Sequence, residues 1–410
     1  MRTILHSDCN SFYVSVECAD HPSLHGKAVA VCGDPKERHG IILAKSDLAK
    51  KYGVATGETV KSALEKCPGL ILLPPNGEKY ADYSHRMRAI YAEYTDRVEP
   101  FGLDESWLDV SGSRNSGVQI AAELRRRARE ELGITVSVGV SFNKVFAKLG
   151  SDLHKPDATT LITVQNFRQK IWPMPAESLL FIGRSTAKRL HEYGLHTIGD
   201  VATCGENVLH ALLGKSGDTL YRYATGCDDT PVLPIEHEDH AKSIGNSTTP
   251  AFDIEDESDA RRILYLLCDS VAERLRAQKM RCRTVSLWIR DSNLLTIERQ
   301  LPLREPTDLS AEIMQASLYL LWRGWDMRSP LRSLGVRGSD LVSSLTGLQQ
   351  TFAATYPNRQ AALENTIDSI RARFGKASLQ RCIMLSSRKV ANSDIRGGIS
   401  TAMSDVYMHN

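Results

Sequence analysis

Residues 2–17 read RTILHSDCNSFYVSVE and residues 101–110 read FGLDESWLDV, and these two stretches decide the fold. In the first stretch an apolar strand ends at Asp8, and a helix capped by Asn or Ser follows. A carboxylate at such a strand-to-helix junction lies where ligands often bind. In the second, Asp104 and Glu105 are adjacent. Successive strand residues point to opposite faces, so both side chains reach one site only if a turn or bulge lies there. Gly102 permits such a bend.

Asp8, Asp104 and Glu105 together form the pattern of a two-metal phosphoryl-transfer site. Two divalent ions about 3.5 to 4 Å apart need oxygen ligands from more than one chain segment, with one carboxylate able to bridge them. Hard oxygen ligands favour Mg²⁺. An acidic pair at a turn is by itself more often a solvated hairpin tip. The third carboxylate at a strand end favours a catalytic centre.

A third stretch, VGVSFNKVFAKLGSDLHKP at residues 138–156, joins a strand to a helix. The three stretches, in this order, resemble the motifs of Y-family translesion DNA polymerases. They are most similar to the bacterial DinB/UmuC group, which includes DNA polymerase IV. The resemblance runs from residue 1 to about residue 345, and more loosely to about residue 390. It implies a DNA-directed DNA polymerase that copies damaged templates at low fidelity, with primer–template DNA and deoxynucleoside triphosphates as partners.

This resemblance assigns the metal chemistry to four residues: the side chains of Asp8, Asp104 and Glu105 and the backbone carbonyl of Cys9. Two Mg²⁺ ions are expected, and catalysis then consists of positioning and charge neutralisation. No motif of a proofreading exonuclease is visible. The alternative is a catalytically weak, polymerase-like module that serves as a DNA-binding scaffold. A degenerate relative of that kind is expected to lose one of the three carboxylates, and this chain retains all of them.

The resemblance also implies where the incoming nucleotide binds, and the residues concerned are Phe12, Tyr13, Lys45, Lys50 and Lys155. Lys155 contacts the triphosphate. Tyr13 is the steric gate, whose ring lies where a ribose 2′-hydroxyl would sit. The chain departs from the family at Asp47 and Lys50, where members commonly carry Tyr and Arg, so a hydroxyl contact is lost and a guanidinium is replaced by a point charge. Lys45 and Lys50 fit a solvated helix surface equally well.

The expected elements form an α+β multidomain chain. Strand 3–8, helix 11–20, two strands near 97–103 and 106–111, helix 117–132 and strand 134–141 make a split βαβ, ferredoxin-like pattern. The helix at 117–132 is predicted because one face carries apolar residues at helical spacing: Val118, Ala121, Leu124, Ala128 and Leu132. Further on, strands are expected at 242–249, 284–290 and 331–337, helices near 256–279 and 307–324, and another helix at 363–375.

In the Y-family resemblance these elements divide into named domains. The palm spans 1–166, with small fingers inserted at about 22–80. A helical thumb with a helix-hairpin-helix spans 167–232, and an exposed linker spans 233–240. The α/β little finger spans 241–345, and 346–410 is a C-terminal extension that ends in a mobile tail. Within the extension, LQQTF at 348–352 resembles a degenerate peptide for the replicative sliding clamp.

Two regions are expected to grip the DNA backbone. The helix-hairpin-helix at 179–201 presents N–H groups near Gly183 to a phosphate, although Phe181 replaces the usual first hairpin glycine. The stretch 271–304 has more basic than acidic residues, and Arg281 and Arg283 are candidate phosphate contacts. A solvated helix face beside a salt-bridged sheet surface explains the same surplus equally well.

Composition places the chain in a broad class. The 51 basic and 49 acidic residues leave a net charge of only +2, so total charge does not point to nucleic acid. Nine cysteines without a CxxC pair predict reduced thiols in the cytoplasm. No apolar run approaches the roughly 18 residues of a membrane helix. We therefore expect a cytoplasmic monomer that does not bind a membrane.

Overall fold

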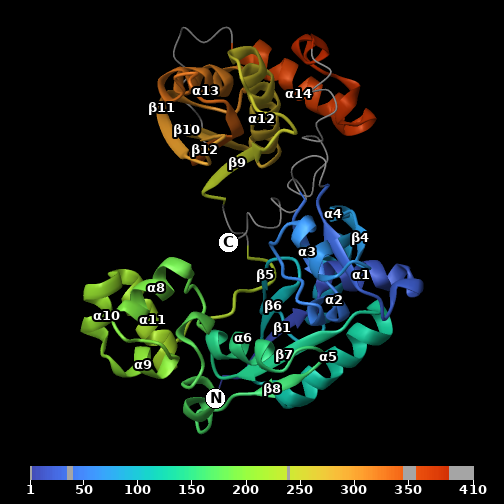
Figure 1. Ribbon diagram of the computed structural model, residues 1–410, viewed down its shortest axis with the longest axis vertical. Coiled ribbons are helices and arrows are strands. Elements are labelled where there is room, and N and C mark those ends of the chain that lie inside the picture. Colours follow the sequence, from blue (N-terminus) through green and yellow to red (C-terminus); the bar gives the residue numbers. More distant parts are fainter. Residues whose placement is uncertain (1, 35–39, 238–240, 345–356, 387–410) are drawn as a thin grey trace. The chain divides into compact units, whose positions relative to one another are not determined.

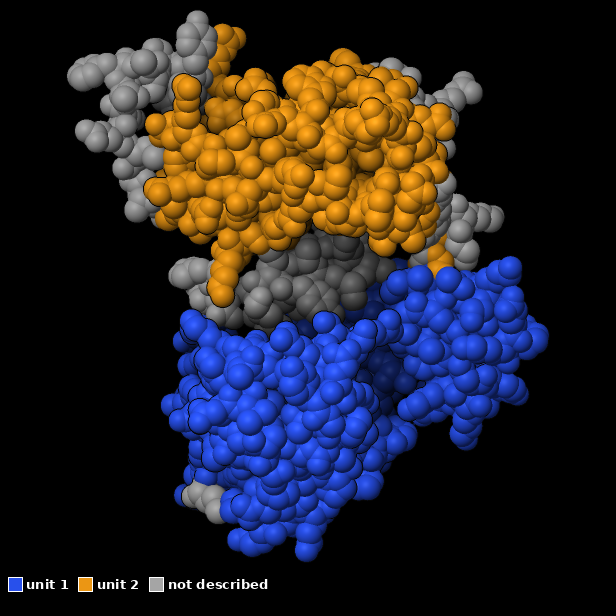
Figure 2. Space-filling model, turned by 60° about the vertical axis from the view of Figure 1, so that its left-hand side comes forward, with its two compact units in different colours: residues 1–32, 41–238 blue, residues 33–40, 239–410 orange. Residues whose placement is uncertain are grey.

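The protein, seen in a computed structural model, is described over residues 2–34, 40–237, 241–344 and 357–386. It is a mixed α/β chain (Figure 1). Two compact units divide it: Met1–Cys32 with Ile41–Glu238, and Gly33–Gly40 with Asp239–Asn410 (Figure 2). Within the described ranges, none of the helices has the length and apolar character that a bilayer crossing requires.

The first unit contains a five-stranded sheet in the order β5-β6-β1-β7-β8. Its strands are β1 (Ile4–Cys9), β5 (Val98–Phe101), β6 (Glu105–Asp109), β7 (Val136–Ser141) and β8 (Thr159–Leu161). The central strand β1 is antiparallel to both β6 and β7, and all six of its residues are buried. The strands predicted near residues 3–8, 97–103, 106–111 and 134–141 are therefore confirmed within a few residues.

Helices α5 (Gly117–Leu132) and α6 (Lys144–Leu153) pack on this sheet, and α1 (Phe12–Asp20) follows β1 in the chain. Helix α6 lies against β7 so closely that a Cβ added at Gly139 would come within 1.9 Å of the Ala147 carbonyl oxygen. Glycine is therefore needed at this position, and the close approach carries the inward face of α6 over the neighbouring strand β1.

Helix α5 forms over the predicted range. A capping box between Ser116 and Gln119 starts it, and Gly133, with a φ of +69°, ends it. The predicted apolar face is confirmed except at Val118, whose side chain is 41 % exposed. Val118 lies in the first turn, and Ile120 takes the buried position instead.

A small three-stranded sheet follows α1, with the order β3-β2-β4. It comprises β2 (Val29–Cys32), β3 (Ile42–Lys45) and β4 (Ile71–Leu73), and α2 (Asp47–Lys51) and α3 (Val60–Lys66) pack on it around a separate apolar core. The longer α4 (Gly77–Ala92) leads back to β5.

The rest of the first unit is helical. Its elements are α7 (Phe167–Ile171), α8 (Arg184–Glu192), α9 (Ile198–Thr203), α10 (Glu206–Leu213) and α11 (Lys215–Thr225). They share one core with α6, in which Phe146 stacks on Phe167 at a centroid distance of 5.2 Å.

The second unit contains a four-stranded antiparallel sheet in the order β11-β10-β12-β9. Its strands are β9 (Ser243–Thr248), β10 (Met280–Asp291), β11 (Thr296–Thr307) and β12 (Leu331–Ser343), and α12 (Glu257–Ala277) and α13 (Ser310–Gly324) cover one face. The sequence did not predict β11. This edge strand is exposed over most of its length, so it lacks the alternation of a half-buried strand.

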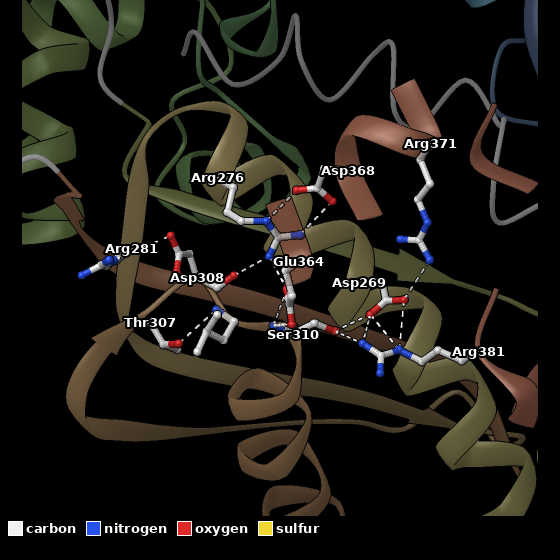
Figure 3. A network of polar contacts seen from close by, with 11 residues as sticks. Asp269, Arg276, Arg281, Thr307, Asp308, Ser310, Glu364, Asp368, Arg371 and Arg381 are labelled. Atoms are coloured by element: carbon white, nitrogen blue, oxygen red, sulfur yellow. Dashed lines mark hydrogen bonds and ion pairs between the residues drawn. The ribbon is translucent and has the colours of Figure 1, made fainter. Parts of the chain in front are cut away.

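Helix α14 (Pro357–Phe374) attaches to the second unit through charged side chains (Figure 3). It begins before the predicted 363–375. Arg276 of α12 pairs with Glu364 and, at 2.6 Å, with Asp368. Glu364 also accepts the Ser310 N–H at 3.0 and 3.1 Å, at the start of α13, where the N-cap residue Leu309 offers no side-chain acceptor. Glu364 therefore caps α13 from another helix.

A second ion-pair group holds the residues after α14. Arg381 lies 2.8 Å from Asp269 of α12, and Arg371 of α14 lies 3.4 Å from the same carboxylate (Figure 3). The helical part of the C-terminal segment is thus packed against its unit. The clamp-like stretch 348–352 and the predicted tail beyond residue 391 lie outside the described residues.

Candidate active site

Asp8 and Glu105 face one another across β1 and β6. The antiparallel register pairs Asp8 with Glu105, and directly opposite residues project from the same face of a sheet. Asp104 ends the turn between β5 and β6, where Gly102 has a φ of +82°. The Cys9 N–H donates to the Asp104 carbonyl at 2.9 Å. The turn that the two adjacent acidic residues require is therefore present, and it brings three carboxylates to one end of the strand pair.

Two lysines contact these carboxylates. Lys148 Nζ in α6 lies 2.6 Å from Glu105 Oε1 and 3.3 Å from Asp8 Oδ2. Lys155 Nζ lies 2.7 Å from the same Asp8 oxygen and 2.7 Å from Asp152. Sequence reasoning selected Lys155 and missed Lys148. Lys148 lies within α6, whereas Lys155 lies two residues beyond the end of that helix at Leu153, so helical spacing does not link the two lysines.

The electrostatics of the cluster indicate an excess of negative charge. Burial, together with the neighbouring Asp8 and Glu105, raises the pKa of Asp104 to about 7. Burial and the Glu105 carboxylate also raise the pKa of Asp8. Burial opposes the charged form of Lys148, but the carboxylates of Glu105 and Asp8 still raise its pKa. Positive charge near this cluster is therefore strongly stabilised.

The donor set matches a hard divalent cation. Carboxylate oxygens dominate it, and Glu105 Oε2 is buried without a hydrogen-bond partner. Burial and the nearby Asp104 raise the pKa of the Cys9 thiol well above its ordinary value, so only the backbone carbonyl of Cys9 suits such an ion. Over the described residues, no three His, Cys, Asp or Glu side chains already converge as a closed metal-binding group. Lys148 and Lys155 contact the carboxylates instead.

Tyr13 lies at the start of α1, and Tyr80 packs against one face of its ring. The ring stacks on Tyr80 of α4, with centroids 4.3 Å apart and an interplanar angle of 15°. Tyr80 is fully buried, and its hydroxyl donates to Glu17 at 2.9 Å. Phe12 is buried in the core, whereas Tyr13 is half-buried. Sequence reasoning missed Tyr80, because nothing local links α4 to the start of α1.

Lys45 and Lys50 lie at the junction of β3 and α2. Ser46 caps α2 by accepting the Ala49 N–H. Lys45 donates to Thr56 at 2.9 Å, and burial, with Lys50 nearby, lowers the pKa of Lys45. Lys50 is exposed. The ammonium groups of Lys45 and Lys50 therefore form a small basic patch. Within the described residues, neither group contacts Asp8, Asp104 or Glu105.

Gly183 lies at the N-terminus of α8, next to an open groove of about 680 Å³ that Arg184 and Lys188 also line. Phe181, at the position of the usual hairpin glycine, has a φ of +68° and is 68 % exposed. The backbone thus keeps the left-handed conformation that glycine favours, in spite of the aromatic side chain.

The basic stretch of the second unit does not form a single face. Arg274 and Arg276 are largely buried in α12, where Arg274 donates to the Gly245 carbonyl at 2.9 Å and Arg276 holds α14. The interpretation of 271–304 as one phosphate-tracking stripe is therefore wrong for these two residues, because α12 turns them inward. Arg281 lies 3.7 Å from Asp308, and Arg283 is exposed.

Two family models and several curated relatives match most of the length of this chain. Residues 7–152 match the model of the impB/mucB/samB family, and residues 241–352 match the model of that family's C-terminal domain. The chain is 48 % identical to DNA polymerase IV of Acetivibrio thermocellus over 94 % of this chain and 98 % of the relative. It is 35 % identical to DNA polymerase IV 1 of Bacillus subtilis over 93 % and 92 %.

One solved structure has a similar fold. It is a Y-family DNA polymerase chimera, Dbh-Dpo4(243-245)-Dbh, which superposes with a TM-score of 0.73 and 22 % identity. The match covers 83 % of this chain and 99 % of the chimera.

Proposed function

The chain belongs to the impB/mucB/samB family, and from this premise we propose that it joins deoxynucleotides to a primer 3′-hydroxyl at the cluster of Asp8, Asp104 and Glu105. It is a DNA-directed DNA polymerase of the Y family that carries out low-fidelity, template-directed synthesis across damaged DNA without proofreading. Its substrates are DNA and nucleotides, and the family depends on divalent metal ions.

One observation carries the placement of the chemistry. Three carboxylates from two segments nearly a hundred residues apart meet at one end of β1 and β6, and two lysines form ion pairs with Asp8 and Glu105. Burying several like charges together lowers the stability of the fold, so such a cluster indicates a functional site. When bound, two Mg²⁺ ions would polarise the triphosphate and lower the pKa of the primer hydroxyl. Asp8, Asp104, Glu105 and the Cys9 carbonyl would hold them.

The lysines and the aromatic residues position the substrate. Lys155 is proposed to bind the triphosphate, because its flexible ammonium already reaches into the carboxylate cluster and can exchange a carboxylate for a phosphate oxygen. Tyr13 is proposed to lie under the incoming sugar, beside Phe12. Tyr80 prevents the Tyr13 ring from moving back, so a ribose 2′-hydroxyl would meet a rigid obstacle. Lys45 and Lys50 add positive charge for the triphosphate.

We assign the parts of the chain to the domains of the Y family. We assign residues 1–166 to the palm with fingers at about 22–80, 167–232 to the thumb, 233–240 to a linker and 241–345 to the little finger, with 346–410 as an extension. The groove at Gly183 and the exposed Arg283 are proposed phosphate contacts, with Arg281 as a weaker candidate because Asp308 competes for it. The stretch 348–352 is proposed to bind a sliding clamp. The protein is proposed to act as a cytoplasmic monomer.

Primer extension with Mg²⁺ on undamaged and abasic templates tests the proposed function. Asp104→Ala or Glu105→Ala should abolish extension and leave primer–template affinity nearly intact, because the groove at Gly183 and the second unit supply most of the binding. Asp82→Asn, an exposed carboxylate on α4, is the matched control and should extend like wild type. A site variant that retains half of the wild-type rate would refute the placement of the active site.

A further inference from the structure

Asp152, in the last turn of α6, contacts the same two lysines that contact the carboxylate cluster. Its Oδ1 lies 2.7 Å from Lys155 Nζ, and its Oδ2 lies 3.6 Å from Lys148 Nζ. The Asp152 side chain is 43 % exposed, whereas that of Asp8 is 5 % exposed. In the part of the chain that the structure describes, the groups that pair with Asp152 are these two ammonium groups. Asp152 therefore lies on the lysine side of the cluster, outside the proposed set of metal ligands.

The position of Asp152 in its own helix offers no stabilisation. The C-terminal end of a helix carries partial negative charge, so an acidic side chain in the last turn is unfavourable. Helix α6 ends at Leu153, one residue later, and its last turn has no basic side chain to compensate. A carboxylate at this place is therefore explained by its contacts with the two lysines.

Both lysines need a partner other than the proposed metal ligands. Lys148 Nζ lies 2.6 Å from Glu105, and Lys155 Nζ lies 2.7 Å from Asp8. A divalent cation binds the same carboxylate oxygens, so the ammonium groups give way to it. The Lys148 side chain is only 14 % exposed, and a buried charge without a partner destabilises a protein. Asp152 offers that partner, because Lys155 already contacts it and Lys148 is one helical turn away.

We propose that Asp152 is a positioning residue that retains the ammonium groups of Lys148 and Lys155 when a divalent cation binds the carboxylate cluster. The proposal rests on the proposed function in taking that cation to be the catalytic metal and Lys155 to be the triphosphate contact. An ammonium group has three hydrogens to donate. Lys155 can therefore hold Asp152 and a phosphate oxygen at once, so its place in the site does not depend on Asp8.

The first test is a Mg²⁺ titration of thermal stability without DNA. Asp152→Asn removes the charge and keeps the shape of the side chain. It should raise the Mg²⁺ concentration for half-maximal stabilisation at least about threefold, which fits an ion pair of this exposure. Asp152→Glu restores the carboxylate and should stay within about twofold of wild type, as should the exposed control Asp82→Asn. A smaller shift in Asp152→Asn, or an equal shift in Asp152→Glu, would overturn the proposal.

The second test separates retention of the lysines from simple attraction between Asp152 and the cation. The Asp152→Asn change is made again in a protein that carries Lys148→Met and Lys155→Met. Retention predicts a shift of less than about twofold there, because no ammonium group remains to be held. Attraction across space predicts the full shift in both proteins, and that result would overturn the proposal. The single variant Lys155→Met, which loses the closer pair, serves the same comparison if the double variant does not fold.

The third test is single-nucleotide insertion at saturating Mg²⁺, which reports the positioning of Lys155. Asp152→Asn should raise the KM for the deoxynucleotide at least about threefold, keep kcat within about twofold of wild type, and have no further effect in Lys155→Met. A residue that only supports the fold would lower kcat and thermal stability together. An unchanged KM, or a loss confined to kcat, would overturn the proposal.

The two hypotheses fail in different ways. If both Mg²⁺ titrations behave as expected but the wild-type protein extends no primer, the proposed function is wrong and the role of Asp152 at a cation site stands. If the wild-type protein extends primers and Asp152→Asn shifts neither the Mg²⁺ midpoint nor the KM, the role of Asp152 is wrong and the polymerase assignment stands.

Discussion

Asp104→Asn should make the metal-free protein more stable at pH 8 while it removes polymerase activity. Burial, Asp8 and Glu105 raise the pKa of Asp104 from 3.8 to about 7. In the unfolded chain this carboxyl ionises near its ordinary pKa, so between those two values the folded state binds more protons than the unfolded state. The free energy of unfolding therefore falls as pH rises through this window, and the loss is complete above about pH 7.

The magnitude follows from the same two pKa values. The difference between 3.8 and about 7 corresponds to roughly 4 kcal/mol for an isolated group. Asp8, Asp104 and Glu105 repel one another, so the three carboxyls titrate as a coupled group. Replacing one of them therefore recovers only part of this free energy. We expect Asp104→Asn to raise the free energy of unfolding at pH 8 by about 1–3 kcal/mol, and by much less at pH 4.

Urea unfolding in the presence of a chelator, at pH 4 and at pH 8, measures this difference, with Asp82→Asn as the exposed control. Added Mg²⁺ should stabilise the wild-type protein more than Asp104→Asn, because the variant lacks one ligand charge. A variant that is less stable than wild type at pH 8, or that shows the same difference at both pH values, would refute the reasoning that charge repulsion dominates this cluster.

Four further changes test other parts of the structure. Tyr13→Ala should incorporate ribonucleotides at least tenfold better while keeping most deoxynucleotide activity, and unchanged discrimination in single-nucleotide insertion kinetics would show that Tyr13 is not the gate. Lys148→Met should lower the Mg²⁺ concentration for half-maximal thermal stabilisation, because the competing ammonium between Asp8 and Glu105 is removed; a higher midpoint would contradict this. Arg283→Glu should flatten the salt dependence of primer–template binding by about 0.9 or more in the log–log slope, and should do so more than Arg281→Glu, whose guanidinium Asp308 already engages; an unchanged slope would place Arg283 away from DNA. Glu364→Ala should lower the free energy of unfolding of the second unit by about 1–3 kcal/mol, because it uncaps α13 and leaves Arg276 short of a partner; a neutral effect in urea unfolding would mean that α14 contributes little to that unit.

Local sequence patterns predicted most of the elements near the active site. Strand β1 and helix α5 formed within a residue or two of expectation, because a buried apolar run and a capped amphipathic face are local signals. The strand β11 was not predicted because it is exposed and lacks alternation, whereas the burial of Arg276 within the basic stretch 271–304 has a different cause. Whether a charged residue lies on a surface or in an ion pair depends on which helix packs on it, and α14 lies about ninety residues further along the chain.

The sequence by itself determined the chemistry of the candidate site. It supplied three carboxylates, a turn at Gly102 that lets adjacent acidic residues share one end of a strand, and the lysine at 155. Only the tertiary structure decided which groups surround them. Lys148 lies between Asp8 and Glu105 because α6 packs on Gly139 of β7, and Tyr80 supports Tyr13 because α4 returns beside α1. Local periodicity specifies which face of an element is buried, whereas contacts between residues far apart in the sequence depend on strand register and helix packing.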